Sequence, residues 1–120
     1  MRINFLGEEH IDRYEAAKEQ LGFKEDIGEY ASFTYLLTSN LLYKTCSKVF
    51  YPKFDIEKAF DILENDKMLS VPQQIMLKLA LDLYRCNYKG DSIIQVFSAF
   101  DEINKKVALE ALKIEFSIFD

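Results

Sequence analysis

The side chains best suited to nucleophilic catalysis or to zinc binding are few in this chain and lie far apart. They are one histidine, His10, and two cysteines, Cys46 and Cys86. A zinc site needs three or four such ligands, and these residues lack any close ligand spacing. The four glycines are scattered, so the chain has no glycine-rich phosphate loop either. We therefore expect no catalytic residue, no metal, no cofactor and a protein that is not an enzyme.

His10 is expected to play a structural role. It lies one helical turn before Tyr14 and near Ala17, at the border of an apolar helix face. We expect its ring to pack at the rim of the core, with one ring nitrogen hydrogen-bonded. The alternative is a small hydrolase or nuclease that uses His10 together with nearby acids. That alternative requires a cleft and converging carboxylates around the ring.

Acidic residues outnumber basic residues by twenty to fifteen, and the net charge is −5. A protein that coats nucleic acid would be basic, so the charge balance argues against that role. The densest acidic group lies between Asp55 and Asp66, on a helix side that we expect to face water. A second acidic group lies near the N-terminus. Its carboxylates can let the protein occupy the basic groove of a nucleic-acid enzyme. Its members are Glu8, Glu9, Asp12 and Glu15.

The stretch from Tyr43 to Phe54 mixes basic and aromatic residues. Residues 31–54 hold three lysines and no acid. Basic side chains among aromatic ones can follow a phosphate backbone while the rings stack on bases. The same stretch can instead form a protein-binding patch, or a corner of the core with lysines facing water. The residues that either binding function would use are Tyr43, Lys44, Lys48, Tyr51 and Lys53.

The elements that position these residues are all predicted to be helices. Ser70 is a good N-cap and Pro72 fits a first helical turn, so a helix is expected over about residues 72–86. Only a narrow polar stripe interrupts its apolar surface, which predicts a central, buried helix. No stretch shows sustained strand alternation. Residues 1–120 are therefore expected to form one all-α domain, a bundle of six or seven short helices around this central one.

The remaining helices follow from apolar spacing and from capping residues. Caps are expected at Asp26, Asp55, Asp101 and either Asp91 or Ser92, with Gly22 ending the first helix. The last helix should bury one apolar face. We expect that face to comprise Ile103, Val107, Ala111 and Ile114, widened by Leu112 and Phe116.

The location of the protein is expected to be inside the cell. The N-terminus has no apolar run long enough for a signal peptide, and no stretch approaches ~20 apolar residues. Cys46 and Cys86 are expected to be buried free thiols in a reducing compartment, although they could pair with each other. We expect a soluble protein that does not contact a membrane.

Five segments, taken in order, carry a resemblance. They are Phe5–Tyr14, Phe33–Asn40, Leu77–Tyr84, Val96–Asn104 and Ala108–Ile114. Together they resemble a family of small helical proteins encoded by phages and mobile elements of Gram-positive bacteria. The chain departs from that family at Glu115, where arginine is expected. The resemblance implies a phage or prophage accessory protein in the bacterial cytoplasm, and it implies no catalytic residue.

The functional expectation combines these observations. We expect a non-enzymatic accessory protein that binds another protein and inhibits or modulates a host or defence protein. The alternative from another class is a nucleic-acid-binding accessory factor that uses Lys44, Lys48, Tyr51 and Lys53. Homo-oligomerisation stays open, because seventeen aromatic residues exceed what one core needs.

Overall fold

Seven helices make up most of the part of the chain that the structure describes, residues 3–84 and 91–118 of a computed structural model. Within these ranges there is no strand, so the predicted all-α fold and single domain are confirmed. None of the helices in the described ranges is long and apolar enough to cross a membrane. The helices are α1 (Glu8–Leu21), α2 (Gly28–Leu37), α3 (Tyr43–Phe50), α4 (Ile56–Asn65), α5 (Val71–Leu83), α6 (Ile93–Ala99) and α7 (Glu102–Glu115).

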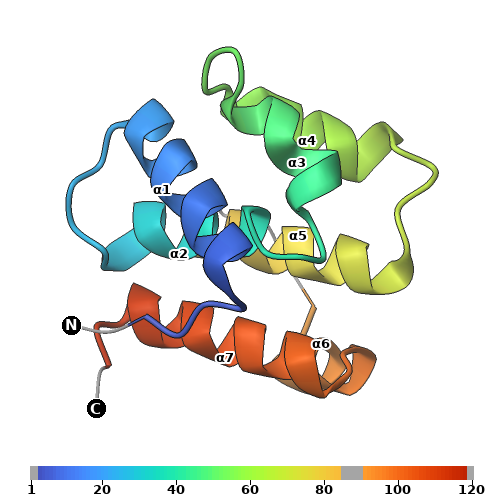
Figure 1. Ribbon diagram of the computed structural model, residues 1–120. Helices are drawn as coiled ribbons and strands as arrows, with labels where there is room; N and C mark the ends of the chain where they lie inside the picture. The colour runs from blue at the N-terminus through green and yellow to red at the C-terminus, as the bar shows by residue number, and fades with distance from the viewer. Residues whose placement is uncertain (1–2, 85–90, 119–120) are drawn as a thin grey trace.

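The helices stack in three layers. The middle layer consists of α2 and α5, which pack against each other (Figure 1). On one side α7 covers α2 and α6 contacts α5, and on the other side lie α1, α3 and α4. The two ends of the described chain lie near each other at one edge (Figure 1). This arrangement leaves α1, α3 and α7 with outer faces that no other helix covers.

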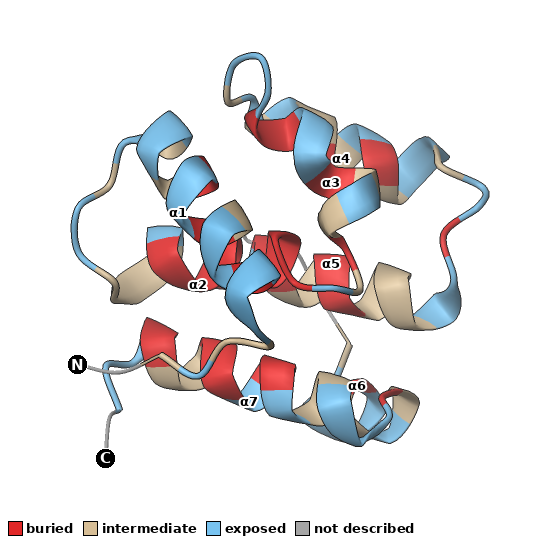
Figure 2. Ribbon diagram, viewed as in Figure 1, coloured by how far each residue is buried: buried red, intermediate tan, exposed pale blue. Residues whose placement is uncertain are grey.

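The most enclosed helix is α2, not α5. Every residue from Ala31 to Ser39 is buried (Figure 2). Those within α2, Ala31 to Leu37, span about two helical turns and therefore point to all sides of the helix. In α5 the buried side chains are interrupted by Ile75, Lys78 and Leu79, which are partly exposed. The helix expected over residues 72–86 is present as α5 (Val71–Leu83) and is a core helix, but α2 is the more enclosed of the two. The predicted end of that helix at residues 85–86 lies outside the described residues.

Local capping signals were good guides to helix boundaries. Gly22 ends the first helix, as predicted, in the left-handed conformation with φ 94°. Asp26, however, does not cap α2, whose first residue, Gly28, has φ 85° and no side-chain cap. The Asp26 carboxylate instead accepts hydrogen bonds from Tyr14 and Lys18 of α1. The predicted N-caps that the structure confirms by side-chain hydrogen bonds are Asp55, Ser70, Ser92 and Asp101.

The predicted apolar face of α7 is only partly buried. Val107, Ala111 and Ile114 are buried, as expected. Ile103 and Phe116 are instead 60% and 62% exposed, and that part of the prediction is wrong. Both lie near the ends of α7, where the packing on α2 does not cover them. The surface of α7 therefore keeps apolar side chains that the core does not use.

The different enclosure of the two middle-layer helices can be measured. Leu36 of α2 is fully buried, whereas Leu79 of α5 is partly exposed. Leu36→Ala should lower the free energy of unfolding by about 3–5 kcal/mol, because the closed surroundings leave a cavity. Leu79→Ala should cost only about 1–2 kcal/mol, because less buried area is lost. Urea unfolding of both variants checks this, and a larger loss for Leu79→Ala would contradict the central position of α2.

Candidate functional site

The two groups of residues that the sequence singled out lie on neighbouring helices. Between α1 and α3 runs an open groove of about 270 Å³ with a mostly apolar lining. The groove brings Asp12 of α1 together with Tyr43 and Tyr51 at the two ends of α3. Its other lining residues include Ala16, Ala17, Leu37 and Phe50. The predicted acidic site and the predicted basic and aromatic site are thus parts of one surface.

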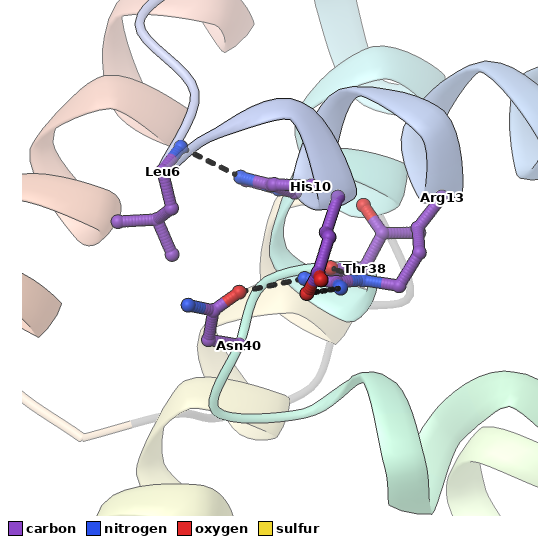
Figure 3. Close-up of polar contacts among 6 residues, drawn as sticks. Leu6, His10, Arg13, Thr38 and Asn40 are labelled. Carbon is purple, nitrogen blue, oxygen red and sulfur yellow. Dashed lines mark hydrogen bonds and ion pairs between the residues drawn. The ribbon is translucent and has the colours of Figure 1, made fainter.

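Arg13 holds this surface in place. Its Nε donates to the Thr38 carbonyl at 2.8 Å, and its Nη2 donates to Oδ1 of Asn40 at 2.6 Å (Figure 3). Thr38 follows the last turn of α2, where helix carbonyls carry partial negative charge. The guanidinium carbon also lies 3.9 Å from the centre of the Tyr43 ring. One side chain therefore joins α1, the end of α2 and the start of α3, so the groove is preformed.

The exposed face of α1 beside the groove carries a stripe of carboxylates, of which Asp12 lines the groove. Glu8, Asp12, Glu15 and Glu19 are exposed and follow one another at spacings of four, three and four residues. This spacing places all four on the helix face that points away from the core. Among the described residues none of them has a hydrogen-bond or ion-pair partner. We call this set the α1 acidic stripe.

For two acids the structure differs from the sequence-based prediction of site residues. Glu9, a predicted site residue, lies 3.9 Å from Arg13 in an ion pair on the exposed surface. Glu19, which the prediction omitted, lies near the groove. Partial burial, and after it the negative charge of Glu19, raises the pKa of Tyr51. The helical spacing that links Glu19 to Glu15 was the signal in the sequence that could have identified it.

The α3 side of the groove is part core and part surface. Val49 and Phe50 are buried, while Tyr51 is 41% exposed at the end of the helix. Lys44, Lys48 and Lys53 are exposed, but none of them lines the groove. The corner therefore contributes to the core, as one of the three interpretations held, and still presents its tyrosines to the groove.

His10 is not at the rim of the core but inside it, with 1% of its surface exposed. Its Nδ1 accepts the Leu6 backbone N–H at 3.2 Å (Figure 3), so the ring proton is on Nε2, which donates to the Tyr35 carbonyl at 3.0 Å. The expectation of one hydrogen-bonded ring nitrogen was wrong because the N-terminal segment covers the ring. Phe5 of that segment packs edge-on against it, with the ring centres 5.1 Å apart.

The chemistry open to His10 and Cys46 is correspondingly limited. Burial lowers the pKa of His10 to about 4, and burial raises the pKa of the Cys46 thiol to about 12. At neutral pH the imidazole is neutral with both nitrogens engaged, and the thiol stays protonated. In the described part of the chain, no three His, Cys, Asp or Glu side chains converge to hold a metal ion. Cys86 and its possible pairing lie outside the described residues.

Two buried glutamates were not anticipated. Glu110 accepts hydrogen bonds from the backbone N–H and the side-chain amide of Asn4, at 3.0 and 3.3 Å. Glu115 accepts one from the Ser32 hydroxyl at 2.7 Å. Both follow the helical spacing of Val107, Ala111 and Ile114, so the sequence placed them on the buried face of α7. They join α7 to the N-terminal segment and to α2.

Comparisons with protein-family models, with curated proteins and with solved structures find no match to this chain. No relative therefore adds to what the arrangement of residues in the groove indicates about function.

The burial of His10 predicts how stability depends on pH. The folded-state pKa of about 4 is below the ordinary value of 6.5. Stability conferred by the neutral ring is therefore complete above pH 6.5 and is lost as the pH falls toward 4, by about 3 kcal/mol in all. His10→Gln should remove this component of the pH dependence.

Two measurements check the prediction for His10. Urea unfolding of the wild type and of His10→Gln between pH 4 and 7 gives the free energy of unfolding at each pH. The slope of this free energy against pH should be smaller for His10→Gln. Since the chain has one histidine, the ring proton shifts in an NMR titration need no assignment. Those shifts should stay constant from pH 8 down to about pH 5. A midpoint near 6.5 in the folded protein would show that the ring is accessible to water.

Proposed function

We propose that this protein acts by binding another protein through the surface formed by α1 and α3, and that it is not an enzyme. The observation that carries the proposal is the preformed apolar groove, which has an exposed tyrosine on one wall and Asp12 on the other. Asp12 belongs to the α1 acidic stripe, whose carboxylates have no pairing partner among the described residues. Tyrosine is enriched among the residues that dominate protein-binding energy. A groove of about 270 Å³ can receive one apolar or aromatic side chain of a partner.

The charges around the groove indicate the chemistry of the partner. The α1 acidic stripe has four carboxylates without a pairing partner among the described residues, and the chain as a whole has a net charge of −5. A partner surface rich in lysine and arginine would complement this stripe and speed association. The partner segment is therefore an apolar side chain flanked by basic ones. A basic nucleic-acid-binding surface of a host or defence protein has this character, and occupying it would inhibit that protein.

The biological context rests on the resemblance of five segments of the chain to small proteins of phages and mobile elements. In that context the protein would be an accessory factor in the bacterial cytoplasm. The buried positions of His10 and Cys46 support a binding role, because these two side chains are engaged in packing and are not exposed to a substrate.

Nucleic acid is a less favoured partner. The exposed lysines Lys44, Lys48 and Lys53 would attract phosphates. However, Glu19 acts on Tyr51, the ring that would stack on a base, and Asp12 lies across the groove. Phosphates that approach the tyrosines would meet these carboxylates. The mixture of charges therefore favours a protein with charges of its own.

Affinity capture from a Gram-positive host, with matched variants as bait, tests the proposal. Asp12→Lys combined with Glu15→Lys reverses the charge of the stripe, and Ala16→Gln places a larger side chain in the groove. Proteins retained by the wild type should be at least about tenfold depleted with either variant, and salt should release them.

The matched control is Asp61→Lys combined with Glu64→Lys on α4, which reverses two exposed acids at the same spacing as Asp12 and Glu15. This control should retain the same proteins as the wild type. Thermal melts verify that all baits are folded. If wild type, control and both groove variants retained the same proteins equally, the α1–α3 surface would not be the binding site.

A further inference from the structure

The outer face of α7 carries a second stripe, in which apolar and basic side chains alternate. Its residues follow one another at spacings of three, three, four and three, so they share one side of the helix. Ile103, Leu109 and Phe116 are 60%, 47% and 62% exposed. Among the described residues, Lys106 and Lys113 have no ion-pair partner. We call Ile103, Lys106, Leu109, Lys113 and Phe116 the α7 stripe.

The α7 stripe is complementary to the α1 acidic stripe in charge and in spacing. Lys106 and Lys113 are seven residues apart, or about 10 Å along the helix, and Asp12 and Glu19 have the same separation. A helix laid alongside α1 in the opposite direction can therefore pair both lysines at once, Lys106 with Glu19 and Lys113 with Asp12. In that register Leu109, between the lysines, lies beside Ala16, between the carboxylates. Ala16 is exposed and lines the groove, so the leucine would reach apolar surface.

The two stripes of one molecule cannot meet. The helices α1 and α7 lie on opposite sides of α2 (Figure 1). Pairing is therefore open only to a second copy of the chain. The contact would join different surfaces of the two copies, so each molecule keeps one free stripe of each kind. Association of this type continues beyond a dimer unless the copies close into a ring.

We infer that a second copy of this chain binds the α1 acidic stripe through its α7 stripe, in a head-to-tail association. The contact covers the α1 side of the groove, so self-association and partner binding compete for one surface. Only the competition rests on the proposed function. The association itself is measured without any partner.

Sedimentation velocity over about a hundredfold range of protein concentration tests the inference. At about 20 mM salt the weight-average mass should rise with concentration, and about 500 mM salt should weaken association at least about tenfold. Lys106→Glu combined with Lys113→Glu should be monomeric throughout. Adding Asp12→Lys and Glu19→Lys to that variant reverses both stripes and should restore association.

The matched control is Lys58→Glu combined with Lys67→Glu, which makes the same charge change on and after α4. It should associate like the wild type. A wild type that is monomeric at every concentration would overturn the inference, and so would association that the four-site reversal fails to restore. If the chain stays monomeric but Lys106→Glu with Lys113→Glu loses captured proteins, the α7 stripe serves a foreign partner and the inference is wrong. Capture by the α1–α3 surface has its own variants, so the two proposals can fail separately.

Discussion

The rest of the structure depends on the enclosure of the α2 segment from Ala31 to Leu37. Its side chains from Ala31 to Leu37 are buried on every side of the helix, so other helices must cover it all round. This requirement produces the layer of α7 below it, α5 beside it and α1 and α3 above it. It also removes the C-terminal carbonyls of α2 from water. Hydroxyl groups of Thr38 and Ser39 donate to two of these carbonyls, and Arg13 donates to a third.

The polar side chains of this protein fall into two groups that behave differently. Among those inside the fold, His10 and Glu110 have hydrogen-bond partners in neighbouring segments. They hold the N-terminal segment and α7 in place, since an unpaired polar group would be costly there. Those on the outer faces of α1 and α7 include several charges without partners among the described residues. Among the described residues, the outer faces of α1 and α7 therefore carry charges that are available to a partner.

Sequence signals predicted the local structure well and the arrangement of helices poorly. The N-caps at Asp55, Ser70 and Asp101 depend only on residues a few positions away, and each was predicted correctly. Asp26 has the same local signal, but a tertiary contact with Tyr14 and Lys18 takes its carboxylate. The central role of α2 was missed because apolar composition marks α5 just as strongly. Only the packing of distant segments decides which of two apolar helices is covered on both sides.

Prediction of the candidate site from the sequence has the same limit, because contacts between distant segments have no local signal. The residue types at Glu8–Glu15 and at Tyr43–Lys53 were identified from composition and spacing, but their convergence across the α1–α3 groove was not. That convergence depends on Arg13, whose contacts with Thr38 and Asn40 span at least 25 residues. No local pattern indicates such a contact. Burial of His10 was underestimated for a related reason, because the covering Phe5 belongs to a segment without regular structure.

The most direct test of the account is native-state hydrogen exchange measured residue by residue. If α2 is the enclosed helix, its amides from Phe33 to Leu37 should exchange only through global unfolding, with protection equal to the full stability of the protein. Amides of α1 and α6 should exchange through smaller openings, because each has one face in water. The result that would contradict the account is slower exchange in α5 than in α2, since the centre of the structure would then lie elsewhere.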